Sequence, residues 1–432
     1  MRLERRLFEV DDVQFGERTT LDGRTLVIKR EELVSELMGI PGITAVDIEL
    51  VHPGESARII HLLDTVLPMV KVEGPGTAYP GQLSDPTLVG EGVTNVLSNV
   101  AVMECCLVPS KTTGLLHVRE AICDMVGPAA EMHPFSHTHN VVLRLQVQEG
   151  KADPEYDVIV RQAGMKTAAR LAAVTRGEEP SRTEVYDLEA GRKPGLPKIA
   201  YVYQVQNQGT FSNTLYYGKS VDNLVPTLLH PQEMLDGALV SGNSVWPLHK
   251  IPTWLHCNCP VMMELLRGHG VDHDFVGMVL SRSHNYTHFE KQRSANLAAK
   301  LVRWLGADGV IVTWEGGGNA ATDAMLTIQA CEKMGIKAAA VSFEFGGPDG
   351  TEGILLVDDV PEADALVSSG SIEKPIVLPP VQRVVGGDKL LLNRETGGEF
   401  TPADGELRFE QSIFLYCAAN QSGYSRLAAV AY

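Results

Sequence analysis

The chain has 432 residues, of which 44% are hydrophobic and 21% are charged. These fractions are close to the average for globular proteins, so they exclude wholesale disorder. The 37 lysines and arginines face 54 aspartates and glutamates, which gives a net charge of −17. A negative field repels phosphate groups, so this charge argues against nucleic acids and anionic membranes as main partners. At roughly 150 residues per domain, the length predicts two or three domains.

Two features of the sequence bear on location. It has no apolar run of the ~18 residues that span a bilayer, and its charged start, Met1-Arg-Leu-Glu-Arg-Arg6, is unlike a secretory signal. The seven cysteines are an odd number in a large chain. Such a count fits free thiols in a reducing compartment better than a disulfide framework. We therefore expect a cytoplasmic protein.

The first half of the chain is typical of short strands and turns. Strands are predicted at 25–29, 45–49 and 57–61, where aliphatic residues lie between glycine, proline or charged residues. The glycine- and proline-rich stretch 74–92 is expected to form loops. A helix is predicted over 158–175, because apolar residues recur there at helical spacing. Its apolar face is predicted at Val158, Gln162, Met165, Ala169 and Ala172.

The second half is more regular. Strands are predicted at 199–203, 237–240, 274–280, 309–314, 337–343 and 363–368, and helices at 287–305 and 319–334. Thr287 and Glu290 form a capping box at the start of the first helix. The apolar faces are predicted at Leu297, Leu301 and Trp304 in the first helix and at Met325, Ile328 and Cys331 in the second.

This alternation of strands and helices predicts the fold class. Strands separated by helices of about 15 residues are typical of βαβ units. We expect an α/β protein with a parallel Rossmann-like sheet in the C-terminal half and a β-rich mixed α/β region before it. The expected divisions are a β-rich mixed domain (1–175), a charged and proline-rich linker (176–197), a segment around the turn 241–244 (198–272), a βαβ Rossmann-like domain (273–386) and a C-terminal β segment (387–432).

Acidic residues and glycines follow two of the predicted strands, at Glu315-Gly-Gly-Gly-Asn319 and Glu344-Phe-Gly-Gly-Pro348. In parallel sheets, ligands bind beyond the carboxyl ends of the strands. The first loop opens a helix whose N-terminus could hold an anion, but it lacks the Gly-Lys-Ser/Thr of phosphate loops. A βα turn that needs positive φ values is the simpler interpretation. A small-molecule or interface loop is the third.

Histidines and cysteines offer further candidate sites. His133, His137 and His139 have a spacing that a metal could use if His137 and His139 share one face of a strand. Pro134 interrupts this pattern, and we predict no metal. Cys257 and Cys259 could form a redox pair, but buried structural thiols are the favoured interpretation.

The turn Ser241-Gly-Asn-Ser244 suggests a sharper hypothesis. The hydroxyl of Ser244 follows the carbonyl of Asn243, and in a suitable turn it can attack that carbonyl and shift the acyl group from nitrogen to oxygen. Elimination of the ester then leaves dehydroalanine, which loses ammonia to water and becomes a pyruvoyl group. The residues alone do not require this chemistry, because Gly-Asn-Ser is also a common turn sequence.

A series of short stretches, taken in order, points to a known family. They are Asp12-Val-Gln-Phe-Gly16, Pro53-Gly-Glu-Ser56, Asn140-Val-Val142, Pro226-Thr-Leu228, Asp236-Gly-Ala238, Val240-Ser-Gly-Asn243, Phe275-Val-Gly277, Leu305-Gly-Ala-Asp-Gly309, Glu315-Gly with Gly318-Asn319, and Leu378-Pro-Pro380. With these stretches the chain resembles the precursor of the α and β subunits of component B of the glycine, sarcosine and betaine reductases. It is more distantly similar to the D-proline reductase precursor.

The resemblance implies an oxidoreductase of the reductive-deaminase type. The precursor would be cut between Asn243 and Ser244, and Ser244 would become a pyruvoyl group that condenses with a small amine such as glycine or sarcosine. A selenolate or thiolate on a partner subunit then breaks the C–N bond, so a hetero-oligomer is expected. For betaine, which cannot form an imine, the role of the pyruvoyl group is open. The family has cysteine where this chain has Ser244, and serine makes the acyl shift harder.

The resemblance also suggests roles near the cut. Asn243 is the scissile residue, and Gly242 allows a tight turn. His249, Lys250 and His256 are close to the cut in the sequence and could move protons. The candidates for holding a substrate ammonium are Glu315, Asn319 and Glu344, although helix capping or a solvated loop would equally explain the two glutamates.

Two other interpretations stay open. An uncleaved chain, with the hydroxyl of Ser244 intact, would be a non-catalytic substrate-binding or structural subunit of such a complex. A metal hydrolase built on His133, His137 and His139 would contain stoichiometric zinc or iron.

Overall fold

The computed structural model describes residues 1–106, 121–206, 214–242, 247–348, 359–390, 392, 401–424 and 430–431. Asn243 and Ser244, and with them the predicted cleavage site, lie outside the described residues. Among the helices that are described, none combines the length and the hydrophobicity that a bilayer crossing requires.

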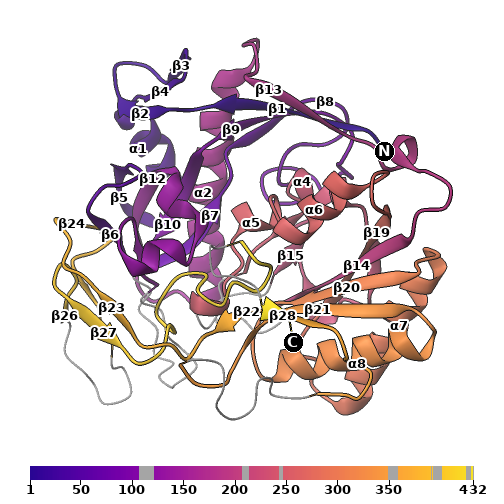
Figure 1. The fold of residues 1–432 in the computed structure, drawn as a ribbon. Helices are drawn as coiled ribbons and strands as arrows, with labels where there is room; N and C mark the ends of the chain where they lie inside the picture. The colour runs from indigo at the N-terminus through magenta and orange to yellow at the C-terminus, as the bar shows by residue number, and fades with distance from the viewer. Residues whose placement is uncertain are drawn as a thin grey trace.

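Two four-stranded sheets dominate the N-terminal half (Figure 1). The first has the order β13-β1-β9-β8, with strands Arg182–Tyr186, Leu3–Glu9, Gly92–Ser98 and Met69–Glu73. The second has the order β5-β12-β10-β7, with strands Ile43–Val51, His139–Val147, Val100–Cys105 and Leu62–Val66. Strand β13 lies within the stretch 176–197, where a linker was predicted, and it pairs antiparallel with β1. Backbone pairing therefore ties this charged stretch to the first sheet.

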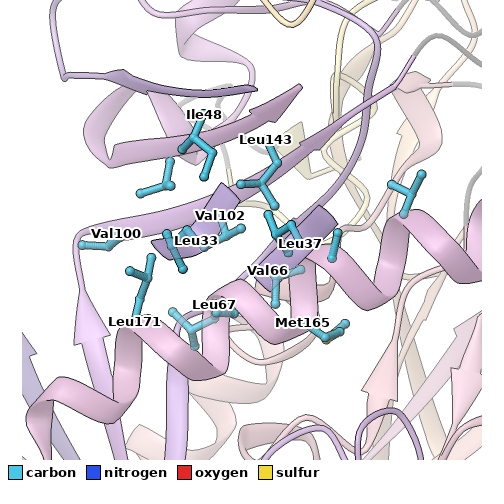
Figure 2. Close-up of a cluster of buried hydrophobic side chains, with 14 of the residues drawn as sticks. Leu33, Leu37, Ile48, Val66, Leu67, Val100, Val102, Leu143, Met165 and Leu171 are labelled. Atoms are coloured by element: carbon cyan, nitrogen blue, oxygen red, sulfur yellow. The ribbon is translucent and has the colours of Figure 1, made fainter. Parts of the chain in front are cut away.

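Helices α1 (Arg30–Met38) and α2 (Asp153–Ala172) close the hydrophobic core of this half. Figure 2 shows Leu33, Leu37, Met165 and Leu171 around aliphatic side chains of the second sheet. The predicted face of α2 is partly wrong, because Val158 is 49% exposed. The helix contacts β7, β8 and β10 together, so its buried surface is broad and includes polar residues that a simple apolar stripe does not predict.

Shorter strands surround these sheets. Strands β2 (Asp12–Phe15), β4 (Thr25–Ile28) and β3 (Thr20–Asp22) form one small sheet, and β11 (Cys123–Asp124), β6 (Ala57–Ile59) and β24 (Arg383–Val385) form another. Two further pairs are β23 (Ile376–Leu378) with β27 (Leu407–Phe409) and β25 (Lys389–Leu390) with β26 (Thr401–Pro402). Because β24 pairs with β6, the C-terminal part of the chain returns to the N-terminal half.

A seven-stranded sheet forms the other half, in the order β17-β19-β14-β20-β21-β22-β28. Its strands are Thr227–Leu229, Asp274–Arg282, Lys198–Val205, Gly309–Trp314, Lys337–Glu344, Leu366–Ser371 and Val430–Ala431. The five central strands run parallel, and both edge strands run antiparallel to their neighbours. The assignment to a Rossmann-like class and the division into domains stay predictions.

Helices α7 (His288–Trp304) and α8 (Asn319–Lys333) cover one face of this sheet. The capping box of Thr287 and Glu290 and the buried face of α8 are confirmed. The predicted face of α7 is wrong at Trp304, which is 77% exposed. Alanines such as Ala298 and Ala299 are buried instead, because α7 contacts both α8 and the sheet and small side chains permit that approach.

The connecting segment 214–268 covers part of the opposite face. Its elements are β15 (Leu215–Tyr216), β16 (Lys219–Ser220), β18 (Leu239–Val240), α4 (Pro231–Leu235), α5 (Thr253–His256) and α6 (Pro260–Gly268), and the short helix α3 (Leu188–Gly191) precedes β14. Strand β14 alternates between the two layers: Ala200 and Val202 belong to the core with α7 and α8, whereas Tyr201 and Tyr203 belong to the core with α4 and α6. Residues of α6, β20 and β21 line an apolar groove of about 700 Å³.

Candidate functional site

One buried ion pair anchors the chain beside the predicted cleavage site. Lys250 and Asp64 are each only 2% exposed, and Lys250 Nζ lies 3.6 Å from Asp64 Oδ1. The same ammonium donates a hydrogen bond to the backbone carbonyl of Gly242 over 2.5 Å. A charge removed from water needs such partners. Because Gly242 directly precedes Asn243, Lys250 fixes the chain just before the predicted cut.

Asp64 extends this anchor into a hydrogen-bond network. Its Oδ1 accepts a bond from the backbone N–H of Thr253 over 3.1 Å, and its Oδ2 accepts one from the Thr253 hydroxyl over 2.6 Å. The backbone N–H of Ser241 in turn donates to Thr253 Oγ1 over 3.0 Å. Two consecutive residues before the predicted cut are therefore bound to two residues after it.

Sequence reasoning named Lys250 but missed Asp64. The signal was available, since Asp64 is the only charge in the run Leu62-Leu-Asp-Thr-Val66, which has three aliphatic residues. Glu104 of β10 is a second such carboxyl group, 1% exposed, whose pKa is raised well above its ordinary value by burial and by the charge of Asp64. Gly164 of α2 makes room for it, because a Cβ there would lie 1.9 Å from Glu104 Oε1.

Glu315 lies directly after β20, at the carboxyl end of the strand as predicted, and is 1% exposed. Its Oε2 accepts hydrogen bonds from Gln206 N (2.8 Å) and Thr214 Oγ1 (3.3 Å), and its Oε1 accepts one from Ile251 N (3.3 Å). Burial raises the pKa of Glu315 from its ordinary 4.5 to about 7, although the hydrogen bond from Gln206 and the charge of Lys250 oppose this rise. Near neutral pH, this group can hold or release a proton.

The C-terminal segment holds the residues that follow the predicted cut. Pro247–His249 form a 3-10 turn, in which Pro247 O accepts from Cys417 N (3.0 Å) and Leu248 O from Ala419 N (2.8 Å). Gln421 donates to His249 O and accepts from Gly316 N, each over 2.7 Å. Gln421 therefore joins this turn to the glycine loop after β20, which no local sequence signal indicated.

The two histidines near the cut are buried and uncharged at neutral pH. Burial lowers the pKa of His249 to about 3, and the charge of neighbouring His284 adds to this shift. Burial and the charge of Lys250 likewise lower the pKa of His256 to about 3. His256 Nδ1 pairs with the hydroxyl of Tyr203 over 2.8 Å. Imidazoles with such low pKa values are weak bases, so proton transfer through them stays a prediction.

The glycine loop after β20 and the end of β21 hold the remaining predicted site residues. Gly316 and Gly318 have φ values of 94° and 60°, which confirms the predicted turn with positive φ. Glu344 ends β21 and is buried. Asn319 begins α8 and is exposed, and its backbone carbonyl accepts a hydrogen bond from Lys291. Substrate binding by Glu315, Asn319 and Glu344 stays a prediction.

The predicted strand face of histidines is wrong. His137 ends a 3-10 turn and His139 begins β12, so the two residues do not alternate along one strand. His133 is buried and its Nε2 lies 3.1 Å from the carbonyl of Asp124. Instead, His133 and His137 line a cavity of about 340 Å³ together with Trp254 of α5 and Tyr424, a size within the range of small-molecule sites.

All seven cysteines are free, as predicted, and all seven are buried. Burial raises the pKa of every one of these thiols. Since the thiolate is the reactive form, such thiols are poor nucleophiles. Cys257 and Cys259 accordingly belong to the core.

Replacing Lys250 by methionine tests the buried ion pair. The variant leaves the Asp64 charge buried without its cation, which we expect to lower the free energy of unfolding by about 3–5 kcal/mol. The matched control is Arg267→Met, since the Arg267 and Glu264 side chains are 64% and 71% exposed and such pairs contribute at most about 1 kcal/mol. Urea denaturation measures both. Equal losses in the two variants would mean that the Lys250–Asp64 pair has no special role.

The raised pKa of Glu315 predicts a pH dependence of stability. Between pH 4.5 and about 7, the folded protein binds a proton at Glu315 that the unfolded chain does not. This contribution is fully present below pH 4.5 and is lost as the pH rises through about 7. We expect Glu315→Gln to remove this decline, so that its melting temperature rises relative to wild type between pH 5 and 8. If the melting temperatures of the two proteins changed with pH in parallel across this range, the raised pKa of Glu315 would be contradicted.

Comparison with known proteins gives the family of this chain. A family model described as glycine/sarcosine/betaine reductase component B subunits matches residues 1–430. The chain is 37% identical over 444 residues to the glycine reductase complex component B subunits alpha and beta of Acetoanaerobium sticklandii, covering 100% of each chain. It is also 37% identical to the sarcosine reductase complex component B subunit alpha of Peptoclostridium acidaminophilum, covering 99% of each.

Two relatives of lower identity are also reductase proteins. The chain is 30% identical to the betaine reductase complex component B subunit alpha of Peptoclostridium acidaminophilum, covering 98% of each chain. It is 21% identical to the D-proline reductase proprotein of Acetoanaerobium sticklandii over 79% of this chain. No solved structure matches it. The chain therefore belongs to the family of glycine/sarcosine/betaine reductase component B subunits.

Proposed function

We propose that this chain is the precursor of a pyruvoyl-containing subunit in a reductase complex that cleaves the C–N bond of a small amine. The relatives named above belong to glycine, sarcosine and betaine reductase complexes, and the proposed substrate is of that class. The precursor is cut between Asn243 and Ser244. The observation that carries the proposal is the buried Lys250, whose ammonium holds the carbonyl just before this bond.

The contacts of the described residues hold the chain on both sides of the proposed cut. Ser241 and Gly242 are bound by Thr253 and Lys250, and the turn at 247–249 is bound by the C-terminal segment. Both ends of the intervening stretch are therefore fixed within the protein. Such a constraint favours attack within the chain, because the reacting groups lose little further freedom on approach.

In the proposed reaction, the Ser244 oxygen attacks the carbonyl carbon of Asn243 and the Asn243–Ser244 amide bond breaks, which leaves an ester. Loss of the Ser244 α-proton expels the Asn243 carboxylate, and water then replaces the nitrogen, which leaves as ammonia. The protons that move in these steps need acceptors and donors. Glu315, with a pKa of about 7, is suited to exchange them near neutral pH, and Lys250 neutralises nearby negative charge.

The described residues also fit a pyruvoyl group at position 244. The segment after the cut contains a buried cation, Lys250, and the next residue, Ile251, donates a backbone hydrogen bond to Glu315, a carboxyl group that is easily protonated. A pyruvoyl group supplies an electrophilic carbonyl that draws electrons from a bound amine. Both side chains are suited to hold polar groups near such a carbonyl in a site with little water.

We further propose that a partner subunit supplies the selenolate or thiolate nucleophile. The sequence contains no selenocysteine, and burial raises the pKa of all seven cysteines. This chain therefore has no thiol suited to that role. A hetero-oligomeric complex follows from this division of labour, and the relative's name, a component of a reductase complex, supports it. The cytoplasmic location stays a prediction from the sequence.

Denaturing mass spectrometry of the full chain tests the cut. We expect two polypeptides that divide after Asn243, the second of them blocked to Edman degradation and shifted by borodeuteride. Ser244→Ala should remain one species of 46.9 kDa, whereas Ser244→Cys should still be cut. Ser241→Ala is the matched control, because it removes a hydroxyl of the same turn but not the nucleophile, and it should also be cut.

The same measurement decides between cleavage and the alternative of an uncleaved subunit. A single intact species in wild type, purified from cells that also make the other subunits of the complex, would overturn the cleavage. It would favour an uncleaved substrate-binding or structural subunit. The serine at position 244, where the family resemblance leads us to expect cysteine, is the feature that keeps this alternative open.

Thiol titration tests the need for a partner nucleophile. In the native protein we expect no rapid reaction with Ellman's reagent, because every thiol is buried. After unfolding in guanidinium chloride, all seven should react. One fast native thiol would contradict this expectation and identify a nucleophile within the chain.

A further inference from the structure

His139, the first residue of β12, and His52, which directly follows β5, face each other at the edge of the second sheet. In the antiparallel pair of β5 and β12, Asn140 lies opposite Val51. One step further along this register brings His139 opposite His52. The Nδ1 atoms of the two rings are 3.0 Å apart, and the ring planes make an angle of 77°. The two rings therefore meet through their nitrogen atoms rather than by stacking.

A carboxylate completes this group. Asp12, the first residue of β2, has its Oδ1 3.8 Å from His52 Nδ1. The ligand atoms of Asp12, His52 and His139 all lie within 4.8 Å of one another. Arg24, the nearby cation, pairs with Glu9 and Asp11 instead. Three ligand atoms of the types that borderline transition metals prefer thus converge from two sheets.

We propose that Asp12, His52 and His139 bind one divalent transition-metal ion of the zinc class. Between two facing imidazole nitrogens lies either a hydrogen that one ring donates to the other or a metal ion that both rings bind. A tetrahedral ion with bonds of about 2.0–2.1 Å to nitrogen places its two nitrogen ligands about 3.4 Å apart. The observed 3.0 Å is within a few tenths of an ångström of this value, and the carboxylate is a ligand that a shared proton does not explain.

The surroundings of the three residues suit such an ion. His139 is the first residue of β12, so its backbone is fixed by the pairing of β12 with β5 and β10. His139 is buried, whereas the His52 and Asp12 side chains are 40% and 53% exposed, which gives an ion a path from solvent. A fourth position is left for water. The bound ion would tie the small sheet of β2 to the end of the β5–β12 pair.

This site differs from the one that the sequence spacing suggested. His133 precedes the 3-10 turn before β12 and His137 ends it, and both residues line the 340 Å³ cavity instead. Only His139 is shared between the two groups. The other two ligands come from 127 and 87 residues earlier in the chain, a distance that no local motif can bridge.

The test uses the full-length, tag-free protein after chelator treatment, with Zn²⁺ titrated by calorimetry and Co²⁺ followed by visible absorption. We expect one equivalent of metal to bind. The visible absorption bands of Co²⁺ should be those of an ion with a low coordination number. His52→Gln, His139→Gln and Asp12→Asn should each weaken binding by more than the roughly 10–100-fold that loss of an outer hydrogen bond costs. His137→Gln is the matched control, since this exposed histidine is outside the group, and it should bind like wild type.

Thermal unfolding gives a second readout. Zn²⁺ should raise the melting temperature of wild type and His137→Gln but not of the three ligand variants. The Asp12→Asn variant should fold like wild type, because the side chain of Asp12 is exposed. A loss of metal binding in this variant is therefore not due to misfolding. If wild type binds no stoichiometric metal, or if the ligand variants bind as it does, the group is a proton-sharing histidine pair only. All three ligands precede residue 243, so this result is independent of the proposed cleavage.

Discussion

Burial of the Lys250 ammonium is the constraint on which the arrangement around residue 242 depends. A cation inside a protein is tolerated only with a counter-charge and acceptors close by, and this chain takes them from distant places. Asp64 comes from β7 of the N-terminal half, and the Gly242 carbonyl comes from the segment that leaves β18. One side chain thus links the β-rich half, the connecting segment and the turn where the chemistry is proposed.

Exclusion of water also shifts the pKa values of buried groups near this site and elsewhere in the protein. It favours the protonated form of Glu315, the neutral forms of His249 and His256, and the unreactive thiol form of all seven cysteines. A site of this kind is suited to acyl and carbonyl chemistry, in which water competes with the intended nucleophile. Membership of the component B family is consistent with such a site, and these contacts are what this chain adds to it.

The regular elements of the second half were largely predictable, because periodicity and caps are local. Strand β20, the Thr287 cap of α7 and the buried face of α8 all follow from a few neighbouring residues. Exposed Trp304 shows the limit, since helix packing selected alanines over larger apolar residues. The site was only half predictable. Lys250 is close to the cut in the sequence and Glu315 follows a predicted strand, whereas the isolated charge of Asp64 does not reveal its partner and Gln421 carries no local signal.

The position of β14 in the seven-stranded sheet determines whether folding or the proposed cut comes first. This strand precedes residue 243, yet it lies between β19 and β20, which follow that residue. If the chain is cut there, both hydrogen-bonding edges of β14 are already occupied by strands of the other piece. Neither piece alone can build the sheet, since one would carry an unpaired central strand and the other a gap. Folding must therefore come first and the cut second, which favours synthesis of both pieces as one polypeptide.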